Sequence, residues 1–256
     1  MNNFILKIKN LNKSFGGLKA VKDVSFNVSK GLIKAVIGPN GAGKTTLFNL
    51  ISGNLEADSG EIIYDSNFIT GLKPYKIAEI GISRTFQTTK LFGHMTVLEN
   101  IMVGRHIKTR SGFLASILNL PSAQKEEKAI IKKSEKILDI FNIGDVSNEY
   151  AQNLSFGKQR LVEFARAYAM EPKLILLDEP AAGLNIHETE EIAQLILKIR
   201  DWGITVLLVE HDMSMVMDIS DEIVVLNQGT YFAEGSPQEI QNDTEVIKVY
   251  LGEDNA

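Results

Sequence analysis

Residues 38–46 read GPNGAGKTT, which matches the pattern G-x-x-x-x-G-K-[ST] of a phosphate-binding loop. The apolar run at residues 32–37 precedes this loop, and a stretch compatible with a helix, residues 46–52, follows it. Strand, loop and helix are the context that the motif requires. Glycines let such a loop turn tightly and aim its N–H groups at an anion, at the positive end of a helix. The stretch therefore predicts a site for the phosphates of a nucleotide.

The side chains of the same loop predict how a nucleotide would be held. Lys44 would reach the β- and γ-phosphates, and the hydroxyl of Thr45 would occupy one position of an octahedral Mg²⁺ shell. The alternative interpretation is a glycine-rich turn that contains a lysine by chance. The residues predicted to bind the nucleotide are Gly38, Pro39, Asn40, Gly41, Ala42, Gly43, Lys44, Thr45 and Thr46.

Composition restricts the classes of protein to which the chain can belong. Its 256 residues, 44% of them hydrophobic and 23% charged, suffice for one large globular domain or for a core with a smaller lobe. The 27 basic and 32 acidic residues give a net charge of −5, so we expect no nucleic-acid partner. There is no cysteine, which excludes disulfides, thiolate metal sites and cysteine nucleophiles.

The sequence also predicts how the chain would relate to a membrane. Lysines interrupt the first residues too early for the apolar core of an export signal, and no apolar run approaches the ~18 residues that span a bilayer. We therefore expect any membrane association to run through a partner.

Hydrophobic periodicity predicts an α/β fold with a mostly parallel sheet, helices on both of its faces and antiparallel strands at the edge. The first two predicted strands would pair in an antiparallel sheet. Capping boxes at residues 96–99 and 236–239 each begin a helix. We predict strands at residues 4–9, 21–28, 60–64, 82–86, 174–179, 204–209, 221–226 and 231–233, and helices at 74–80, 96–103, 122–141 and from 236.

Two predicted strands end in residues that suit nucleotide chemistry. Residues 174–179 read LILLDE, an apolar run typical of a central parallel strand, whose carboxyl end is where ligands of such sheets bind. Asp178 would hold Mg²⁺ through water, and Glu179 would polarise an attacking water; a helix-capping acid pair is the alternative. The second strand, residues 204–209, leads to His211, which could donate to a γ-phosphate oxygen.

Three further positions have both a functional and a structural interpretation. Gln87 ends a predicted strand, where its amide would ligate a metal or contact water, or would simply be solvated. Phe15 is either a core aromatic or a surface on which a nucleobase stacks. Ser155 and Gly157 open a predicted helix, which is a second candidate anion site or an ordinary helix cap.

Residues 105–121 break the helical pattern and mix basic with apolar side chains. This composition indicates either an exposed lobe that docks on a partner or a solvated loop.

Taken in order, these motifs resemble those of the ATPase subunits of ABC transporters over essentially the full chain. The resemblance is closest to the branch that transports branched-chain amino acids, in its larger ATPase subunit. It is carried by RTFQ at 84–87, MTVLENIMVGRH at 95–106, DEPAAGLN at 178–185, EHDM at 210–213 and the closing NQGTYFAEGSPQEI and VIKVYLGE. In family terms the chain has Walker A at 38–46, the Q-loop Gln87, the signature at 154–158, Walker B at Asp178 and Glu179, the D-loop at 182–185, the switch His211 and the adenine-stacking Phe15.

Three positions depart from the family pattern. Phe156 and Lys158 replace a glycine and the glutamine of the usual signature Leu-Ser-Gly-Gly-Gln, and Asn185 replaces the D-loop aspartate. Phe156 and Asn185 are familiar in this branch, whereas Lys158 would put a charge in place of the usual glutamine contact. Since Ser155, Gly157 and Glu179 remain, we expect an active enzyme.

The resemblance implies a single ABC ATPase domain: a nucleotide-binding core with an antiparallel β-subdomain at residues 1–87 and 166–256, and a helical subdomain at 88–165. It implies the cofactors ATP and Mg²⁺, with Glu179, His211 and Gln87 in catalysis and Thr45, Gln87 and Asp178 around the metal. Ser155 and Gly157 would act in trans, on ATP held by a second ATPase subunit in a head-to-tail dimer.

The resemblance also implies the setting of the chain. Its other partners would be permease subunits at the cytoplasmic face of the membrane and, indirectly, an extracytoplasmic solute-binding protein. The implied cargo is branched-chain amino acids, and urea or short amides are the alternative cargo. A soluble ABC ATPase without transport is the alternative function. The dimer could be a homodimer or a heterodimer.

Overall fold

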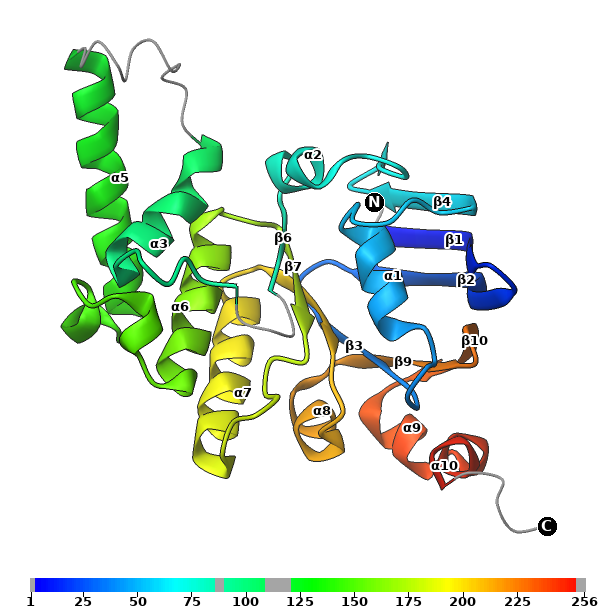
Figure 1. The fold of residues 1–256 in the computed structure, drawn as a ribbon. Coiled ribbons are helices and arrows are strands. Elements are labelled where there is room, and N and C mark those ends of the chain that lie inside the picture. The colour runs from blue at the N-terminus through cyan, green and yellow to red at the C-terminus, as the bar shows by residue number, and fades with distance from the viewer. Residues whose placement is uncertain (1–2, 86–89, 109–120, 252–256) are drawn as a thin grey trace. The chain divides into compact units, whose positions relative to one another are not determined.

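The computed structural model describes residues 3–85, 90–108 and 121–251, which form two compact units (Figure 1). One unit comprises residues Met1–Gln87 and Lys173–Ala256, and the other comprises Thr88–Pro172. The boundary expected after residue 165 falls inside helix α6, Phe156–Ala169.

The first unit contains two sheets, one antiparallel and one mostly parallel. The antiparallel sheet has the order β2-β1-β4-β5, with β1 at Phe4–Phe15, β2 at Leu18–Ser29, β4 at Ser59–Tyr64 and β5 at Asn67–Phe68. The other has the order β10-β9-β3-β8-β7-β6, with β3 at Ile33–Ile37, β6 at Ile82–Arg84, β7 at Leu174–Asp178, β8 at Thr205–Val209, β9 at Glu222–Asn227 and β10 at Thr230–Gly235. Only the β9–β10 pair of this sheet is antiparallel. The predicted α/β class with a mostly parallel sheet is confirmed.

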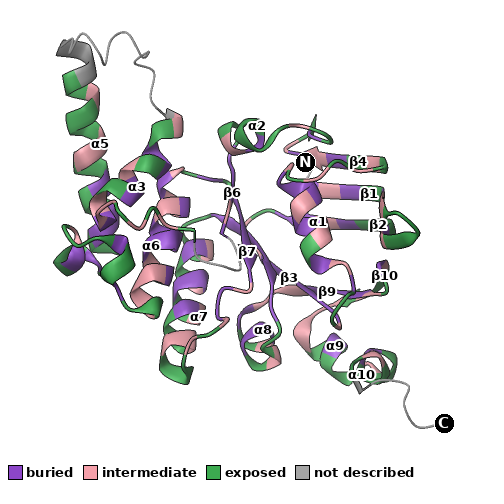
Figure 2. Cartoon of the chain, in the orientation of Figure 1, coloured by how far each residue is buried: buried purple, intermediate pink, exposed green. Residues whose placement is uncertain are grey.

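Three central strands of the parallel sheet end at the same level. Every residue of β3, β7 and β8 is buried, as expected for strands covered on both faces. Figure 2 shows this for β3 and β7. In the register, Val209 at the end of β8 lies opposite Asp178 of β7 and opposite Val36 of β3. The segments that follow these strands therefore emerge at one edge of the sheet, where ligands of α/β folds bind.

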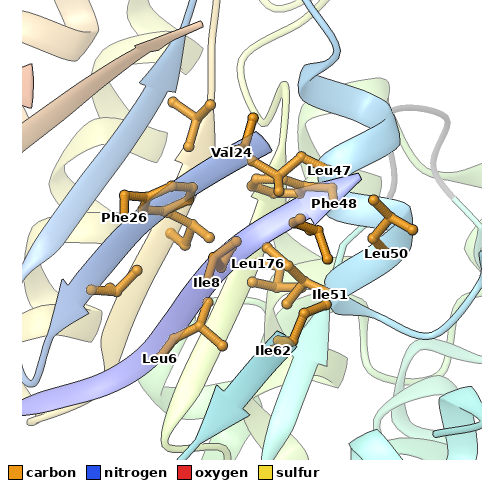
Figure 3. Close-up of a cluster of buried hydrophobic side chains, with 14 of the residues drawn as sticks. Leu6, Ile8, Val24, Phe26, Leu47, Phe48, Leu50, Ile51, Ile62 and Leu176 are labelled. Atoms are coloured by element: carbon orange, nitrogen blue, oxygen red, sulfur yellow. The ribbon is translucent and has the colours of Figure 1, made fainter. Parts of the chain in front are cut away.

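Helix α1, Lys44–Ile51, packs into the core between side chains of both sheets. Phe48 is fully buried in a cluster with Leu6 and Ile8 of β1 and Leu176 of β7 (Figure 3). Because the phosphate loop leads directly into α1, this packing sets the direction of the helix end that faces the loop.

The remaining helices of the first unit range from 6 residues in α2 to 16 in α7, and most are capped locally. Ser236 and Glu239 form the predicted capping box of α9, and Asn185 and Glu188 form another for α7. The bounds are α2 Pro74–Glu79, α7 Ile186–Asp201, α8 Met213–Ile219, α9 Pro237–Asn242 and α10 Thr244–Leu251.

The second unit is helical in its described part. Thr96 and Glu99 form the predicted capping box at the start of α3, and Gly104 lets α3 approach α6 closely, because an added Cβ would lie 2.3 Å from the carbonyl oxygen of Arg166. Within α6, Arg160 and Glu163 form a fully buried ion pair at 2.9 Å. The helices are α3 Val97–Arg105, α5 Pro121–Ile140 and α6, with 3₁₀ turns at His106–Lys108, Gly144–Val146 and Ala151–Asn153. Most of the predicted docking segment, residues 105–121, lies outside the described residues.

The core packing predicts a matched pair of stability effects. Phe48→Ala removes a buried ring, which should lower the free energy of unfolding by about 3–5 kcal/mol. Phe68→Ala, at a side chain that is 66% exposed, should change it by less than about 0.5 kcal/mol. Urea denaturation followed by circular dichroism measures both, and equal losses would contradict this account of the core.

Candidate nucleotide-binding site

The phosphate loop passes within contact distance of backbone from two other strands. Gly38 and Gly43 have φ of 148° and 98°, conformations that favour glycine. A Cβ on Gly38 would lie 2.1 Å from the carbonyl oxygen of Leu226, and one on Gly43 would lie 2.3 Å from that of Ala20. The loop therefore keeps its path only with glycine at both positions.

Lys44 lies at the first turn of α1 and is 6% exposed. Its Nζ donates to the carbonyl oxygens of Gly38 at 2.7 Å and Pro39 at 3.0 Å. Burial lowers the pKa of Lys44, and the negative charges of Glu179 and Asp178 oppose that shift. The ammonium group thus sits in the loop beside two acids and is satisfied by carbonyl dipoles, which a phosphate could replace.

A cavity of about 670 Å³ lies beside the loop. Its volume is in the range of small-molecule sites, about 300–1,000 Å³. The structure brings these predicted site residues together on its wall: Phe15, Asn40, Gly41, Ala42, Gly43, Lys44, Thr45, Thr46, Glu179 and His211. Pro39 instead lines a second cavity, together with residues of α10. Phe15 is 47% exposed, so its ring is available for stacking.

Glu179 and His211 meet directly, although they follow different strands. Glu179 Oε1 and His211 Nε2 are 2.9 Å apart. The backbone of Glu179 has φ of 49°, the left-handed region, and its N–H donates to the carbonyl oxygen of Val209 at 2.9 Å. Strained residues of this kind concentrate at functional sites, and this one lies on the cavity wall.

Asp178 is buried, and only one of its two carboxylate oxygens has a hydrogen-bond partner among the described residues. Its Oδ2 accepts from Arg84 at 2.8 Å, and the same guanidinium donates to Asn49 at 2.8 Å and to Ser52 at 2.7 Å. Asp178 Oδ1 is buried and has no hydrogen-bond partner among the described residues. An acceptor in this position fits a metal-bound water.

The donor set around the loop suits a hard cation with few protein ligands. Thr45 lines the cavity, and Asp178, which is buried and does not line it, has an unpaired carboxylate oxygen. No group of three or more His, Cys, Asp or Glu side chains within the described ranges could form a protein-only metal cage. Mg²⁺ takes one or two protein oxygens together with phosphates and water, so these residues fit it.

Ser155 and Gly157 belong to the second unit. Ser155 is the exposed N-cap of α6, and its Oγ accepts from the N–H of Lys158 at 3.4 Å. The side chain of Lys158 pairs with Asp145 at 2.8 Å. Both predicted residues thus lie at an accessible helix N-terminus, whereas Gln87 lies outside the described residues.

Two further residues that the sequence did not single out, Arg84 and Glu210, contact the predicted site residues or their backbone. Arg84 holds Asp178 from 94 positions away, and no local pattern signals such a pair. Glu210 precedes His211 and accepts backbone N–H groups near both Glu179 and His211. Its position, an acid directly after a buried strand, was a usable signal.

Comparison with known proteins gives full-length matches. A family model described as "ABC transporter" matches residues 21–182, and one described as "Branched-chain amino acid ATP-binding cassette transporter" matches residues 232–256. The chain is 43% identical to the "High-affinity branched-chain amino acid transport ATP-binding protein BraF" of Pseudomonas aeruginosa, over 99% of this chain and 100% of that protein. It is 41% identical to the "High-affinity branched-chain amino acid transport ATP-binding protein LivG" of Escherichia coli K12, over 99% of this chain and 100% of that protein.

Solved structures match over a similar extent. A nucleotide-free ATP-binding cassette from an ABC transporter has a TM-score of 0.85 and 37% identity, covering 98% of this chain and 100% of that chain. A dimeric cassette in a post-hydrolysis state, bound to ADP and Pi, has a TM-score of 0.77 and 27% identity, covering 91% of this chain and 98% of that chain.

The loop geometry predicts that Gly43→Ala weakens nucleotide binding. The added Cβ would meet the carbonyl oxygen of Ala20, so the loop must shift, and we expect at least about a tenfold loss of ATP affinity by calorimetry, or ~1.4 kcal/mol. Gly203→Ala is the control, because Gly203 also has positive φ but no described atom lies within 4 Å of its added Cβ. Unchanged affinity in Gly43→Ala would contradict the steric argument.

Proposed function

This chain belongs to the ABC transporter family, as its motifs predicted, and we propose that it is an ATP-hydrolysing subunit that powers import of branched-chain amino acids. The main observation behind this proposal is that Glu179 Oε1 and His211 Nε2 lie 2.9 Å apart, and that both residues line the phosphate-loop cavity. A binding module without catalysis would not need a carboxylate and an imidazole in contact at this place.

Two findings support the proposed cargo. The relatives named for branched-chain amino-acid transport match over their whole length, at 41% and 43% identity. The match to the branched-chain amino-acid cassette family covers residues 232–256, outside the general ATPase region. Import of urea or short amides is the alternative that a transport assay must test.

In the proposed mechanism, ATP occupies the cavity beside the loop. Phe15 stacks on the adenine, the loop N–H groups and Lys44 hold the phosphates, and Lys44 exchanges its carbonyl partners for phosphate oxygens. Thr45, Gln87 and, through water, Asp178 would hold Mg²⁺, which supplies neutralisation of phosphate charge.

Glu179 and His211 have separate roles in the reaction that we propose. Glu179 orients the attacking water and accepts its proton, because its carboxylate lies on the cavity wall. His211 donates to an oxygen of the γ-phosphate. Their contact at 2.9 Å fixes the two groups relative to each other before a nucleotide arrives.

The proposed assembly is a head-to-tail dimer of ATPase subunits. Ser155 and Gly157, at the exposed N-terminus of α6, would contact the γ-phosphate of ATP held by the other subunit. Solved cassettes at 27% identity are described as dimers, which supports this arrangement. Moving such a dimer from mostly open to mostly closed takes about 5.5 kcal/mol of differential binding, which two ATP molecules would share.

The proposed setting is the cytoplasmic face of the membrane, where permease subunits would hold the chain and a solute-binding protein would deliver cargo. No helix of the described residues has the length and apolar character to cross a bilayer.

Reconstitution tests the proposed function. The chain is assembled with its permease, second ATPase subunit and solute-binding protein in liposomes, and uptake of labelled leucine and urea is followed. We expect leucine uptake that requires ATP on the side of this chain. Urea uptake in place of leucine would overturn the cargo, and uptake without ATP hydrolysis would overturn the energy source.

Lys44→Ala should weaken ATP binding. Loss of a charge-assisted contact to phosphate costs about 1.5–3 kcal/mol, or roughly 10- to 150-fold in affinity. Lys30→Ala is the matched control, since Lys30 is exposed and pairs with Asp65. Calorimetry with ATP and Mg²⁺ measures both variants, and an unchanged affinity for Lys44→Ala would refute the role given to the loop.

Glu179→Gln should bind ATP but hydrolyse it on the order of 10²–10⁴ times more slowly, because the proton acceptor is lost. We therefore expect a closed dimer that persists in ATP and Mg²⁺, detectable by light scattering after size-exclusion chromatography. Glu61→Gln, at an exposed residue of β4, is the control. Turnover at the parent rate would exclude Glu179 as the acceptor.

A further inference from the structure

We propose that Glu210 is a positioning residue that holds Glu179 and His211 in their working arrangement. The proposal rests on the proposed function, since it takes the roles of those two side chains from there. Glu210 directly follows β8 and is 4% exposed. Its carboxylate is therefore a buried acid at the edge of the sheet where the nucleotide cavity lies.

The two oxygens of Glu210 bind different segments of the chain. Oε1 accepts the N–H of Ala181 at 2.8 Å. Oε2 accepts the N–H of His211 at 2.9 Å and, more weakly, that of Asp212 at 3.4 Å. One carboxylate thus bridges the segment that follows β7 and the segment that follows β8.

This bridge bears directly on the strained backbone of Glu179. A left-handed conformation outside glycine costs about 1–3 kcal/mol and persists only where its surroundings enforce it. Here the N–H of Glu179 donates to Val209, and Ala181, two residues further on, is held by Glu210. Without the second tether the segment after Glu179 can relax, which would move its carboxylate away from His211.

The chemistry of the contact calls for a carboxylate. Within the described residues Glu210 forms no ion pair with Lys or Arg, so backbone N–H groups are what compensates its burial there. A glutamine has the same size but a single acceptor oxygen, and its NH₂ would face an N–H donor. An aspartate keeps the charge but is one methylene shorter, so it reaches one segment at most.

The experiment compares Glu210→Gln and Glu210→Asp with Glu222→Gln. Glu222 is a suitable control because its carboxylate pairs with Lys34 of the neighbouring strand β3. Neither residue lines the cavity. Steady-state ATP hydrolysis is measured in the reconstituted transporter, and amide hydrogen exchange at residues 179–182 and 210–213 is measured in the purified full chain. Using two substitutions at Glu210 guards against one that fails to fold.

We expect kcat to fall by about 10- to 100-fold in both Glu210 variants, since small misplacement of reacting groups has effects of that size. KM for ATP should stay within about threefold, because the loop that grips the phosphates is unchanged. In a His211→Ala background the same change should cost much less, since the arrangement it protects is already lost. Exchange at both segments should accelerate by about tenfold or more, with no change in Glu222→Gln.

An unchanged kcat, a loss that appears only in KM, or equal losses with and without His211 would overturn the proposal, as would unchanged exchange. Failure of the proposed function is a distinct result. If the parent complex does not hydrolyse ATP, the proposed function is wrong. In that case the amide hydrogen exchange at residues 179–182 and 210–213 still tests whether Glu210 holds those two segments.

Discussion

The nucleotide site depends on a steric constraint at the phosphate loop. Gly38 and Gly43 run so close to the backbone of β9 and β2 that no side chain fits at either position. Those strands belong to different sheets, and Phe48 of α1 is buried in the core that joins them. The shape of the loop is therefore imposed by the packed fold, which leaves its N–H groups oriented before any phosphate is present.

Charge at the same edge is balanced by short-range pairing. Lys44 is satisfied by carbonyl oxygens of its own loop, Asp178 by Arg84, and Glu179 contacts His211. Burial alone would make each of these charges costly. A bound nucleotide would bring phosphate charge to this edge, and Lys44 would then exchange its carbonyl partners for phosphate oxygens.

Local and periodic signals predicted most of the fold but few of the pairings. The apolar strands β7 and β8 and the capping box at Thr96 were predictable because a fully buried strand shows no alternation and a cap lies within four residues. The helix after Asn185 was missed despite its capping box. The hairpin of β1 and β2 extends beyond its predicted ends, through register shifts that no sequence pattern marks. Arg84 with Asp178 and the left-handed φ of Glu179 arise only when distant segments meet.

If the preformed loop recognises phosphates, affinity must depend on the number of phosphates in the ligand. Calorimetric titration of the purified chain with ATP, ADP and AMP in excess Mg²⁺ compares ligands that share the base and sugar. We expect comparable affinities for ATP and ADP and at least a roughly tenfold weaker affinity for AMP, which lacks the phosphates that the loop and Lys44 hold. AMP binding as tightly as ATP would contradict this expectation.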